Sequence, residues 1–224
     1  MTTLVPGLMQ KKQFNIINIL QHASIWHGNS EVVTNSVEGG IHRINYFDLY
    51  DRTCQLSNAL STLGINPGDR IGTMAWNTWR HLECWYGLSG FGAICHTLNP
   101  RLFPDQIEYI VNHAENRFIF IDTTFIPVIE NVLDKLPKLE GLIVMTDQEH
   151  MTDDMQNLEI PVYCYEHLLE AESKSFDWPV FSEDTASSLC YTSGTTGNPK
   201  GVLYSHASNL NHAMVISHVD LFGL

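Results

Sequence analysis

Residues 191–202 read Tyr-Thr-Ser-Gly-Thr-Thr-Gly-Asn-Pro-Lys-Gly-Val, a stretch rich in glycine and hydroxyl groups between two apolar runs. Glycine lets backbone N–H groups turn toward an anion and lets that anion come close, and hydroxyl groups add further donors. Lys200 supplies the mobile positive charge that a polyphosphate needs. The stretch therefore predicts a phosphate-binding loop at the end of a buried strand formed by residues 186–192, with a second strand resuming at residues 202–204.

The loop differs from a Walker A loop, which ends in Gly-Lys-Ser/Thr. Here Pro199 precedes Lys200 and Gly201 follows it. A different class of nucleotide-binding loop is indicated. The alternative interpretation is a plain surface turn, because residues 198–201 place Pro at the second and Gly at the fourth position of a β-turn.

The run Ser193–Gly201 resembles the phosphate-binding signature of the adenylate-forming (AMP-binding) superfamily, which contains acyl-CoA synthetases, luciferases and the adenylation domains of peptide synthetases. The resemblance implies a loop that wraps the β- and γ-phosphates of ATP and stabilises the leaving pyrophosphate. It assigns a catalytic role to Lys200 and contact with Mg²⁺ to Thr192. The residues that it assigns to nucleotide binding are Thr192, Ser193, Gly194, Thr195, Thr196, Gly197 and Lys200.

Further segments narrow the resemblance to fatty acid–CoA ligases of the medium- to long-chain type. These segments are Gly68-Asp69-Arg70, Trp76-Asn77, Arg80-His81-Leu82-Glu83, residues 98–102 and residues 109–114. Taken singly, they predict turns and core elements without chemistry. The implied reaction joins a fatty acid to ATP, giving acyl-AMP and pyrophosphate, and the thiol of CoA then displaces AMP. The implied cofactors and partners are ATP, Mg²⁺, CoA and a fatty acid, and some long-chain relatives imply a homodimer through the N-terminal segment.

The order of apolar and helical segments predicts an α/β fold. Apolar runs alternate with helical stretches. The apolar runs lie at residues 70–75, 93–97, 118–121 and 142–146, and the helical stretches lie at residues 78–91, 104–113 and 125–136. This alternation is typical of a mostly parallel sheet with helices on both faces. A helix at residues 15–26, a hairpin at 31–35 and 41–46 and a helix at 47–63 precede it. By the resemblance, this is the N-terminal part of the large adenylate-forming domain, incomplete at its C-terminus.

The expected division of this partial AMP-binding domain, residues 1–224, has three segments. Residues 1–46 form the N-terminal helix and hairpin, residues 47–172 the βα-repeating subdomain, and residues 185–224 the strand, phosphate loop and following helix. The family's aromatic-histidine gate, adenosine-site aspartate and C-terminal lysine-bearing domain are not found. We therefore expect a truncated ligase that is inactive alone. The alternatives are a non-catalytic fragment or interaction module, and a relative that adenylates another carboxylate.

Composition limits the other classes of function. The formal net charge of −13 argues against broad contact with nucleic acid or anionic membranes. Five scattered cysteines without a Cys-x-x-Cys pair favour a reducing, cytoplasmic location. No apolar run has the ~18 residues of a membrane span, and the eleven histidines lack metal-site spacing.

Several further residues, most of them close to the motif, are expected to have structural roles. His206 is expected near a helix start, capped by Ser205 and running to about residue 219. Cys190 is expected to be buried and unreactive, because no basic residue adjoins it in sequence. Tyr191 is interpreted as a packing residue. Asn77 is expected to cap the helix that follows it.

Overall fold

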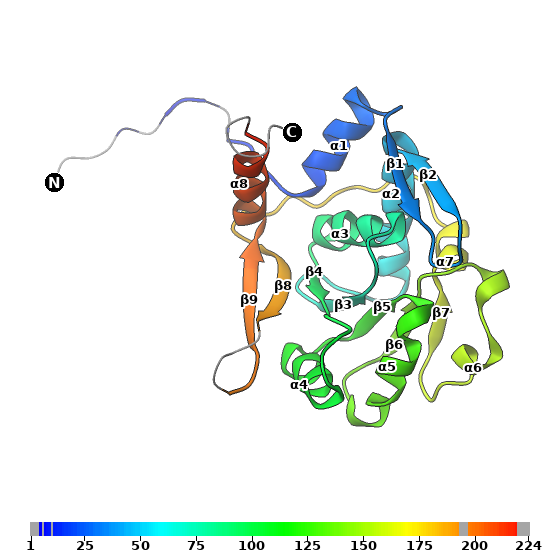
Figure 1. The fold of residues 1–224 in the computed structure, drawn as a ribbon. Helices are drawn as coiled ribbons and strands as arrows, with labels where there is room; N and C mark the ends of the chain where they lie inside the picture. Colours follow the sequence, from blue (N-terminus) through cyan, green and yellow to red (C-terminus); the bar gives the residue numbers. More distant parts are fainter. Residues whose placement is uncertain (1–4, 6, 10, 193–196, 219–224) are drawn as a thin grey trace.

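A computed structural model describes residues 5, 7–9, 11–192 and 197–218. In these residues a seven-stranded sheet has the order β7-β6-β5-β3-β4-β8-β9, and β1 and β2 form a separate hairpin. All neighbours in the large sheet run parallel except β8 and β9, which are antiparallel. The α/β fold with a mostly parallel sheet is therefore confirmed (Figure 1).

The strands of the large sheet are β3 (Arg70–Met74), β4 (Ile94–Thr97), β5 (Phe118–Ile121), β6 (Gly141–Val144), β7 (Val162–Cys164), β8 (Ala186–Thr192) and β9 (Lys200–Ser205). The hairpin strands are β1 (Glu31–Asn35) and β2 (Ile41–Asn45). The helices are α1 (Ile17–Trp26), α2 (Tyr46–Thr62), α3 (Trp79–Phe91), α4 (Pro104–Ala114), α5 (Ile126–Glu130), α6 (Asp153–Gln156), α7 (Tyr165–Glu170) and α8 (His206–Ile216). Short 3₁₀ turns lie at Thr123–Phe125, Leu133–Lys135 and Gln148–His150.

Helices cover both faces of the sheet. Successive residues of a strand point to opposite faces, so they pack in two different cores. Phe118 and Phe120 of β5 pack in a cluster with α2, α3 and α7. Ile119 and Ile121 of the same strand pack with α4 and α5. Figure 1 shows α2 and α3 on one side of the strands and α4 and α5 on the other.

Local capping explains where several helices begin and end. The Asn45 side chain accepts a hydrogen bond from Asp48 N and starts α2. Gly64, with φ +71°, follows the end of that helix in the left-handed region that favours glycine. Pro104 occupies the first turn of α4. These starts and stops allow short connections between strands and helices.

Several expected boundaries differ from those in the structure, and β9 begins two residues before the strand expected at residues 202–204. Thr78, not Asn77, caps α3, because its hydroxyl accepts from His81 N. The helix expected at residues 125–136 is reduced to α5 with 3₁₀ turns on either side, since Val132 leaves helical geometry at φ −128° and ψ 3° while its side chain stays buried. Packing therefore overrides helical periodicity there. The last described helix ends at Ile216, short of residue 219, which lies outside the described residues.

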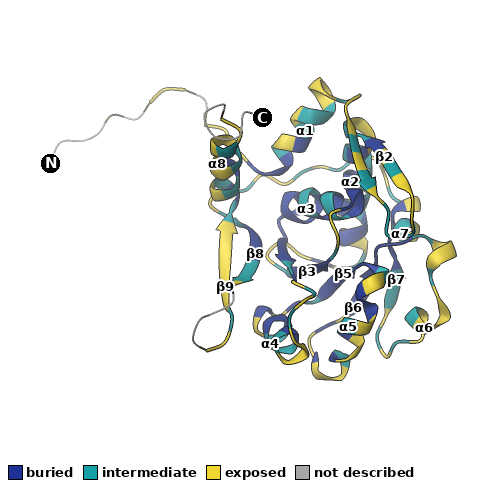
Figure 2. Ribbon diagram, in the orientation of Figure 1, coloured by how far each residue is buried: buried dark blue, intermediate teal, exposed yellow. Residues whose placement is uncertain are grey.

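β9 forms one edge of the sheet and is mostly exposed (Figure 2). β8, between β9 and β4, has three consecutive buried residues, Ser187, Ser188 and Leu189. The Ser89 hydroxyl on α3 donates to Ser187 O at 3.0 Å. Hence β8 is fixed to the core while β9 depends on β8 for its position.

Candidate functional site

The β8–β9 hairpin brings the two ends of the predicted phosphate loop together. Thr192 pairs with Lys200 in the antiparallel register, and Tyr191 pairs with Gly201. Gly197, on the way back to β9, has φ +91°, a conformation that favours glycine. The other predicted loop residues, Ser193, Gly194, Thr195 and Thr196, lie outside the described residues.

The side chains at the two strand ends are accessible. Thr192 and Lys200 are both exposed. The Thr192 hydroxyl donates to Lys200 O over 3.5 Å, a long hydrogen bond that leaves its oxygen available as an acceptor or ligand. In the described part of the chain, no carboxylate forms an ion pair with Lys200. The ammonium group is therefore available to an anion.

The sequence around the hairpin carries little opposing charge. Residues 185–219 contain no Asp or Glu, in a chain that has 25 acidic residues in total. Lys200 is the one Lys or Arg in the same segment. No carboxylate within this segment can therefore repel an anion. An anion site at the hairpin is compatible with a strongly acidic protein.

Tyr191 precedes Thr192. From the sequence it is interpreted as a packing residue, but in the structure its hydroxyl also makes a polar contact. Its hydroxyl oxygen lies 2.5 Å from Nδ1 of His113 on α4. Its ring centroid is 5.2 Å from that of His96 on β4 and 5.8 Å from that of His113. Burial raises the pKa of Tyr191, so the phenol keeps its proton at neutral pH. The tyrosine joins the root of the loop to α4.

Cys190 is half-buried, and the expectation of full burial was wrong. Its Sγ lies 3.1 Å from Oγ1 of Thr97 on β4. The other four cysteines, Cys54, Cys84, Cys95 and Cys164, are buried and free. These contacts place Cys190 as a link between β8 and β4.

His206 lies directly after the capping residue Ser205 at the start of α8 and is fully buried. Its Nδ1 accepts a hydrogen bond from Ile16 N at 3.1 Å. Burial lowers the pKa of His206 to about 4, so the ring is neutral at physiological pH. The ring holds the N-terminal segment against the base of the hairpin, which agrees with the structural interpretation.

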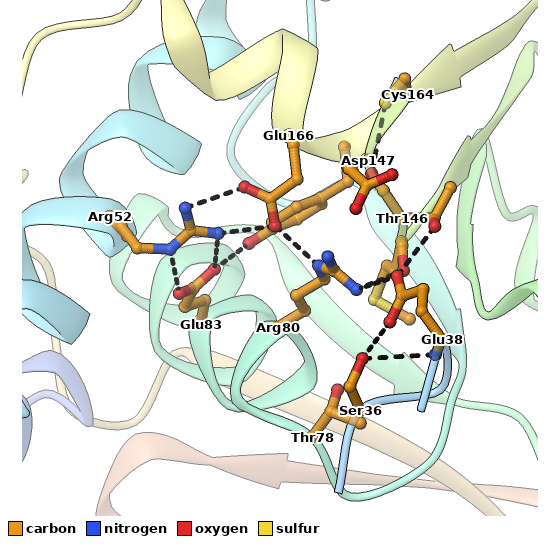
Figure 3. Close-up of polar contacts among 12 residues, drawn as sticks. Ser36, Glu38, Arg52, Thr78, Arg80, Glu83, Thr146, Asp147, Cys164 and Glu166 are labelled. Carbon is orange, nitrogen blue, oxygen red and sulfur yellow. Dashed lines mark hydrogen bonds and ion pairs between the residues drawn. The ribbon is translucent and has the colours of Figure 1, made fainter. Parts of the chain in front are cut away.

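An ion network that the sequence analysis did not predict joins five charged side chains, which are Arg52, Arg80, Glu38, Glu83 and Glu166 (Figure 3). Arg52 contacts Glu83 at 2.6 Å and Glu166 at 2.9 Å. Arg80 contacts Glu38 at 2.6 Å and Glu166 at 2.7 Å. Charged residues on the apolar helix at residues 78–91 were the signal available in sequence, but their partners lie 31 to 86 positions away.

The network shifts the pKa values of its acids in different directions. Burial raises the pKa of Glu83, although Arg52 opposes the shift. Burial also disfavours ionisation of Glu166, but Arg52 and Arg80 hold its pKa below the usual range. Burial opposes ionisation of Glu38 as well, but hydrogen bonds from Ser36 and Thr146 and the charge of Arg80 outweigh it and lower the pKa to about 2. These ion pairs join α2, α3, α7 and the turn between β1 and β2.

A cavity of about 830 Å³ lies beside the network, between the β1–β2 hairpin and the starts of α2 and α3. His42 stacks on Trp79 at its wall, with ring centroids 3.6 Å apart. Both lining arginines of the network already contact carboxylates. The cavity therefore offers an anion no unpaired arginine from that network.

The described residues hold neither a cluster of metal-ligating side chains nor a membrane-spanning helix. In residues 5, 7–9, 11–192 and 197–218, no group of three or more His, Cys, Asp or Glu side chains could hold a metal ion. No helix among the described elements is both long and apolar enough to cross a bilayer.

Comparison with known proteins places the chain in a family. A family model described as AMP-binding enzyme matches residues 21–223. The chain is 43% identical over 218 residues to a 3-methylmercaptopropionyl-CoA ligase of Ruegeria lacuscaerulensis, covering 97% of this chain and 40% of the relative. It is 41% identical over 218 residues to a medium-chain-fatty-acid–CoA ligase of Ectopseudomonas oleovorans, covering 97% and 39%.

Solved structures show the same fold. The anthranilate CoA ligase AuaEII superposes with a TM-score of 0.83 at 22% identity, over 96% of this chain and 39% of that one. The chain thus spans about 40% of the length of the curated relatives it matches. Because the family model extends over residues 21–223, and the fold corresponds to the N-terminal part of adenylate-forming domains, the chain belongs to the AMP-binding family of adenylate-forming enzymes.

Proposed function

We propose that this chain supplies the pyrophosphate-binding hairpin of an ATP-dependent acid–CoA ligase. The observation that carries the proposal is the pairing of Thr192 with Lys200, which presents an exposed hydroxyl and an exposed ammonium group at one end of a hairpin. In the proposed reaction a carboxylate attacks the α-phosphorus of ATP, acyl-AMP forms and pyrophosphate leaves. The CoA thiol then displaces AMP to form acyl-CoA.

Lys200 stabilises the negative charge that accumulates on the leaving pyrophosphate. The backbone N–H groups and hydroxyls of residues 192–197 add donors around the same anion, as part of one electrostatic clamp. No side chain of the hairpin forms a covalent bond to the substrate in this scheme. The contribution of the hairpin is therefore to hold the phosphates while the reaction takes place at the α-phosphorus.

Mg²⁺ fits this site only in part. The exposed Thr192 hydroxyl, which makes one long hydrogen bond among the described residues, is an oxygen ligand of the kind that Mg²⁺ accepts. One hydroxyl does not make a complete site, and the ATP phosphates and further oxygen ligands would complete it. When bound, Mg²⁺ supplies charge neutralisation on the phosphates.

We propose a medium- or long-chain fatty acid as the carboxylate substrate. The support is the similarity to the medium-chain-fatty-acid–CoA ligase of E. oleovorans and, at 35% identity, to a long-chain-fatty-acid–CoA ligase of Thermus thermophilus. A short thioether acid such as 3-methylmercaptopropionate is the second candidate, since two relatives with that activity are 43% and 42% identical to this chain. Residues 1–46 as a homodimer contact and the three-segment domain division remain predictions.

The test is ATP–pyrophosphate exchange, measured with octanoate, palmitate and 3-methylmercaptopropionate. We expect any exchange by this chain to fall at least tenfold in Lys200→Ala, since a charge-assisted contact is worth about 1.5–3 kcal/mol. Lys174→Ala is the matched control, because Lys174 is an exposed lysine near Asp51. Exchange that survives Lys200→Ala would overturn the role of the hairpin. Complete absence of exchange with all three acids would favour a non-catalytic chain.

A further inference from the structure

Tyr191 lies in β8 directly before Thr192, at the loop end of the β8–β9 hairpin. Its ring lies near His96 on one strand and His113 on α4, and its hydroxyl is hydrogen-bonded to His113 Nδ1 at 2.5 Å. His96 is fully buried and its Nδ1 lies 2.8 Å from Asn116 Oδ1, so it forms a rigid wall. His113 in turn stacks on Tyr109, with centroids 5.3 Å apart. These neighbours leave the tyrosine ring little freedom.

The same ring lies over the glycine that follows Lys200. A Cβ added at Gly201 would be 3.1 Å from Tyr191 Cζ and 3.2 Å from Leu189 Cδ1, both closer than most real contacts. Gly201 does not have positive φ, so its backbone conformation is open to other residues. The constraint at this position is therefore space: the strand must approach the tyrosine ring closely.

These contacts form a continuous path from α4 to Lys200. His113 holds the Tyr191 hydroxyl, the Tyr191 ring packs on Gly201, and Gly201 is covalently joined to Lys200. The edge strand β9 has exposed residues and pairs on one side with β8 alone. The Tyr191 ring and the Leu189 side chain therefore both lie against the first residues of β9.

We propose that Tyr191 is a positioning residue: held by His113 and packed against Gly201, it sets the position of Lys200 relative to Thr192. The inference rests on the proposed function of the hairpin as a pyrophosphate clamp. Tyr191 itself touches no phosphate in this scheme. Its effect is indirect, because Lys200 is a flexible point charge whose attraction to an anion depends on where its backbone lies.

Two variants separate positioning from ordinary packing. Tyr191→Phe keeps the ring over Gly201 and removes the hydrogen bond, and His113→Leu removes the same bond from the other side. His113→Asn is the conservative variant, since a side-chain amide can hydrogen-bond to the tyrosine. Tyr204→Phe is the matched control, because Tyr204 lies in β9 and no hydrogen bond to its hydroxyl occurs in the described residues.

The measurement is the affinity of the full chain for magnesium pyrophosphate by titration calorimetry, with the thermal midpoint of each variant measured in parallel. We expect Tyr191→Phe and His113→Leu to weaken binding by about threefold to tenfold, the range that one hydrogen bond is worth. The double variant should be no weaker than either single one, because both remove one bond. His113→Asn should restore affinity, and Tyr204→Phe should leave it unchanged.

Gly201→Ala tests the close approach. The new methyl group should displace Tyr191 or β9 and weaken pyrophosphate binding, while Gly7→Ala, with nothing within 4 Å of the added atom, should not. Wild-type affinity in Tyr191→Phe, His113→Leu and Gly201→Ala would overturn the proposal. So would losses of affinity that only follow losses of thermal midpoint, since these would indicate a merely structural role.

Lys200→Ala distinguishes failure of this proposal from failure of the proposed function. Reduced binding in Lys200→Ala with normal binding in the Tyr191 variants would contradict positioning alone. If the wild-type chain binds no pyrophosphate, the proposed function fails, and amide hydrogen exchange decides the positioning. Exchange at residues 200–202 should then be faster in Tyr191→Phe than in Tyr204→Phe, and equal rates would overturn the proposal.

Discussion

Arg80 on α3 contacts Glu38 in the turn between β1 and β2, with Nη1 2.6 Å from Oε1. The two side chains are only 6% and 9% exposed, so this ion pair lies in a partly desolvated setting. Thr146, which follows β6, donates a second hydrogen bond to the same carboxylate at 2.8 Å. The contacts close the hairpin onto the carboxyl end of the large sheet.

The first prediction concerns acid sensitivity at Glu38. Its folded-state pKa is about 2, below the ordinary value of 4.5 that applies to the unfolded chain. The unfolded chain therefore takes up a proton first as pH falls, so the stability that Glu38 contributes is present above pH 4.5 and is lost toward pH 2. Glu38→Gln should lower the unfolding free energy at pH 7 by about 1–3 kcal/mol.

Urea denaturation at pH 7, 4 and 3 measures this effect. The difference between the wild type and Glu38→Gln should shrink as pH falls. Glu31→Gln is the control, because Glu31 pairs with Arg43 where both side chains are more than half exposed. A constant difference between pH 7 and pH 3 would contradict the assignment of the acid response to Glu38.

The second prediction concerns Arg52. Its partner Glu83 is completely buried and also accepts from Tyr165 Oη at 2.6 Å, so Arg52→Met leaves a buried carboxylate without its cation. Removing one partner of a buried pair costs about 3–5 kcal/mol. Arg43→Met, which breaks an exposed pair, should cost less than about 1 kcal/mol. Equal losses in urea denaturation would show that the network adds no more than surface pairs do.

The third prediction concerns Asp122, which follows β5 and is 1% exposed. Burial outweighs the hydrogen bond from Trp76 N and raises the pKa of Asp122 to about 6, above its ordinary value of 3.8. For a raised pKa the contribution to stability is present below pH 3.8 and is lost as pH rises through 6. Asp122→Asn should therefore gain stability relative to the wild type between pH 4 and pH 7.

Thermal midpoints across that pH range test the third prediction. In Asp122→Asn the Trp76 N–H can still donate to the oxygen of the new side-chain amide, so the local backbone contact is retained. Asp105→Asn is a suitable control, since Asp105 is exposed in the first turn of α4. A relative stability that does not change with pH would show that Asp122 does not titrate in this window.

Local patterns predicted the regular elements well. Apolar runs predicted β5 and β8 at their observed boundaries, and the strand expected at residues 31–35 is β1. The helix expected at residues 125–136 was too long, because the buried side chain of Val132 is placed by tertiary packing and not by helical geometry. Periodicity carries no information on such a choice.

The candidate site was predictable in part. The expected strand at residues 186–192 matches β8, but β9 begins at Lys200, two residues before the strand expected at residues 202–204. The contact between Tyr191 and His113 joins residues 78 positions apart, and that between Arg80 and Glu166 joins residues 86 apart. One sequence does not show which distant polar residues meet, so neither contact is predictable from it.

The central claim is that Lys200, paired with Thr192, binds the leaving pyrophosphate. Its most direct test is titration of the full chain with magnesium pyrophosphate, with Lys200→Ala and the control Lys174→Ala measured in parallel. We predict binding by the wild type and Lys174→Ala, and an affinity at least about tenfold lower in Lys200→Ala, as expected for loss of a charge-assisted contact. Equal affinity in Lys200→Ala and the wild type would contradict the claim.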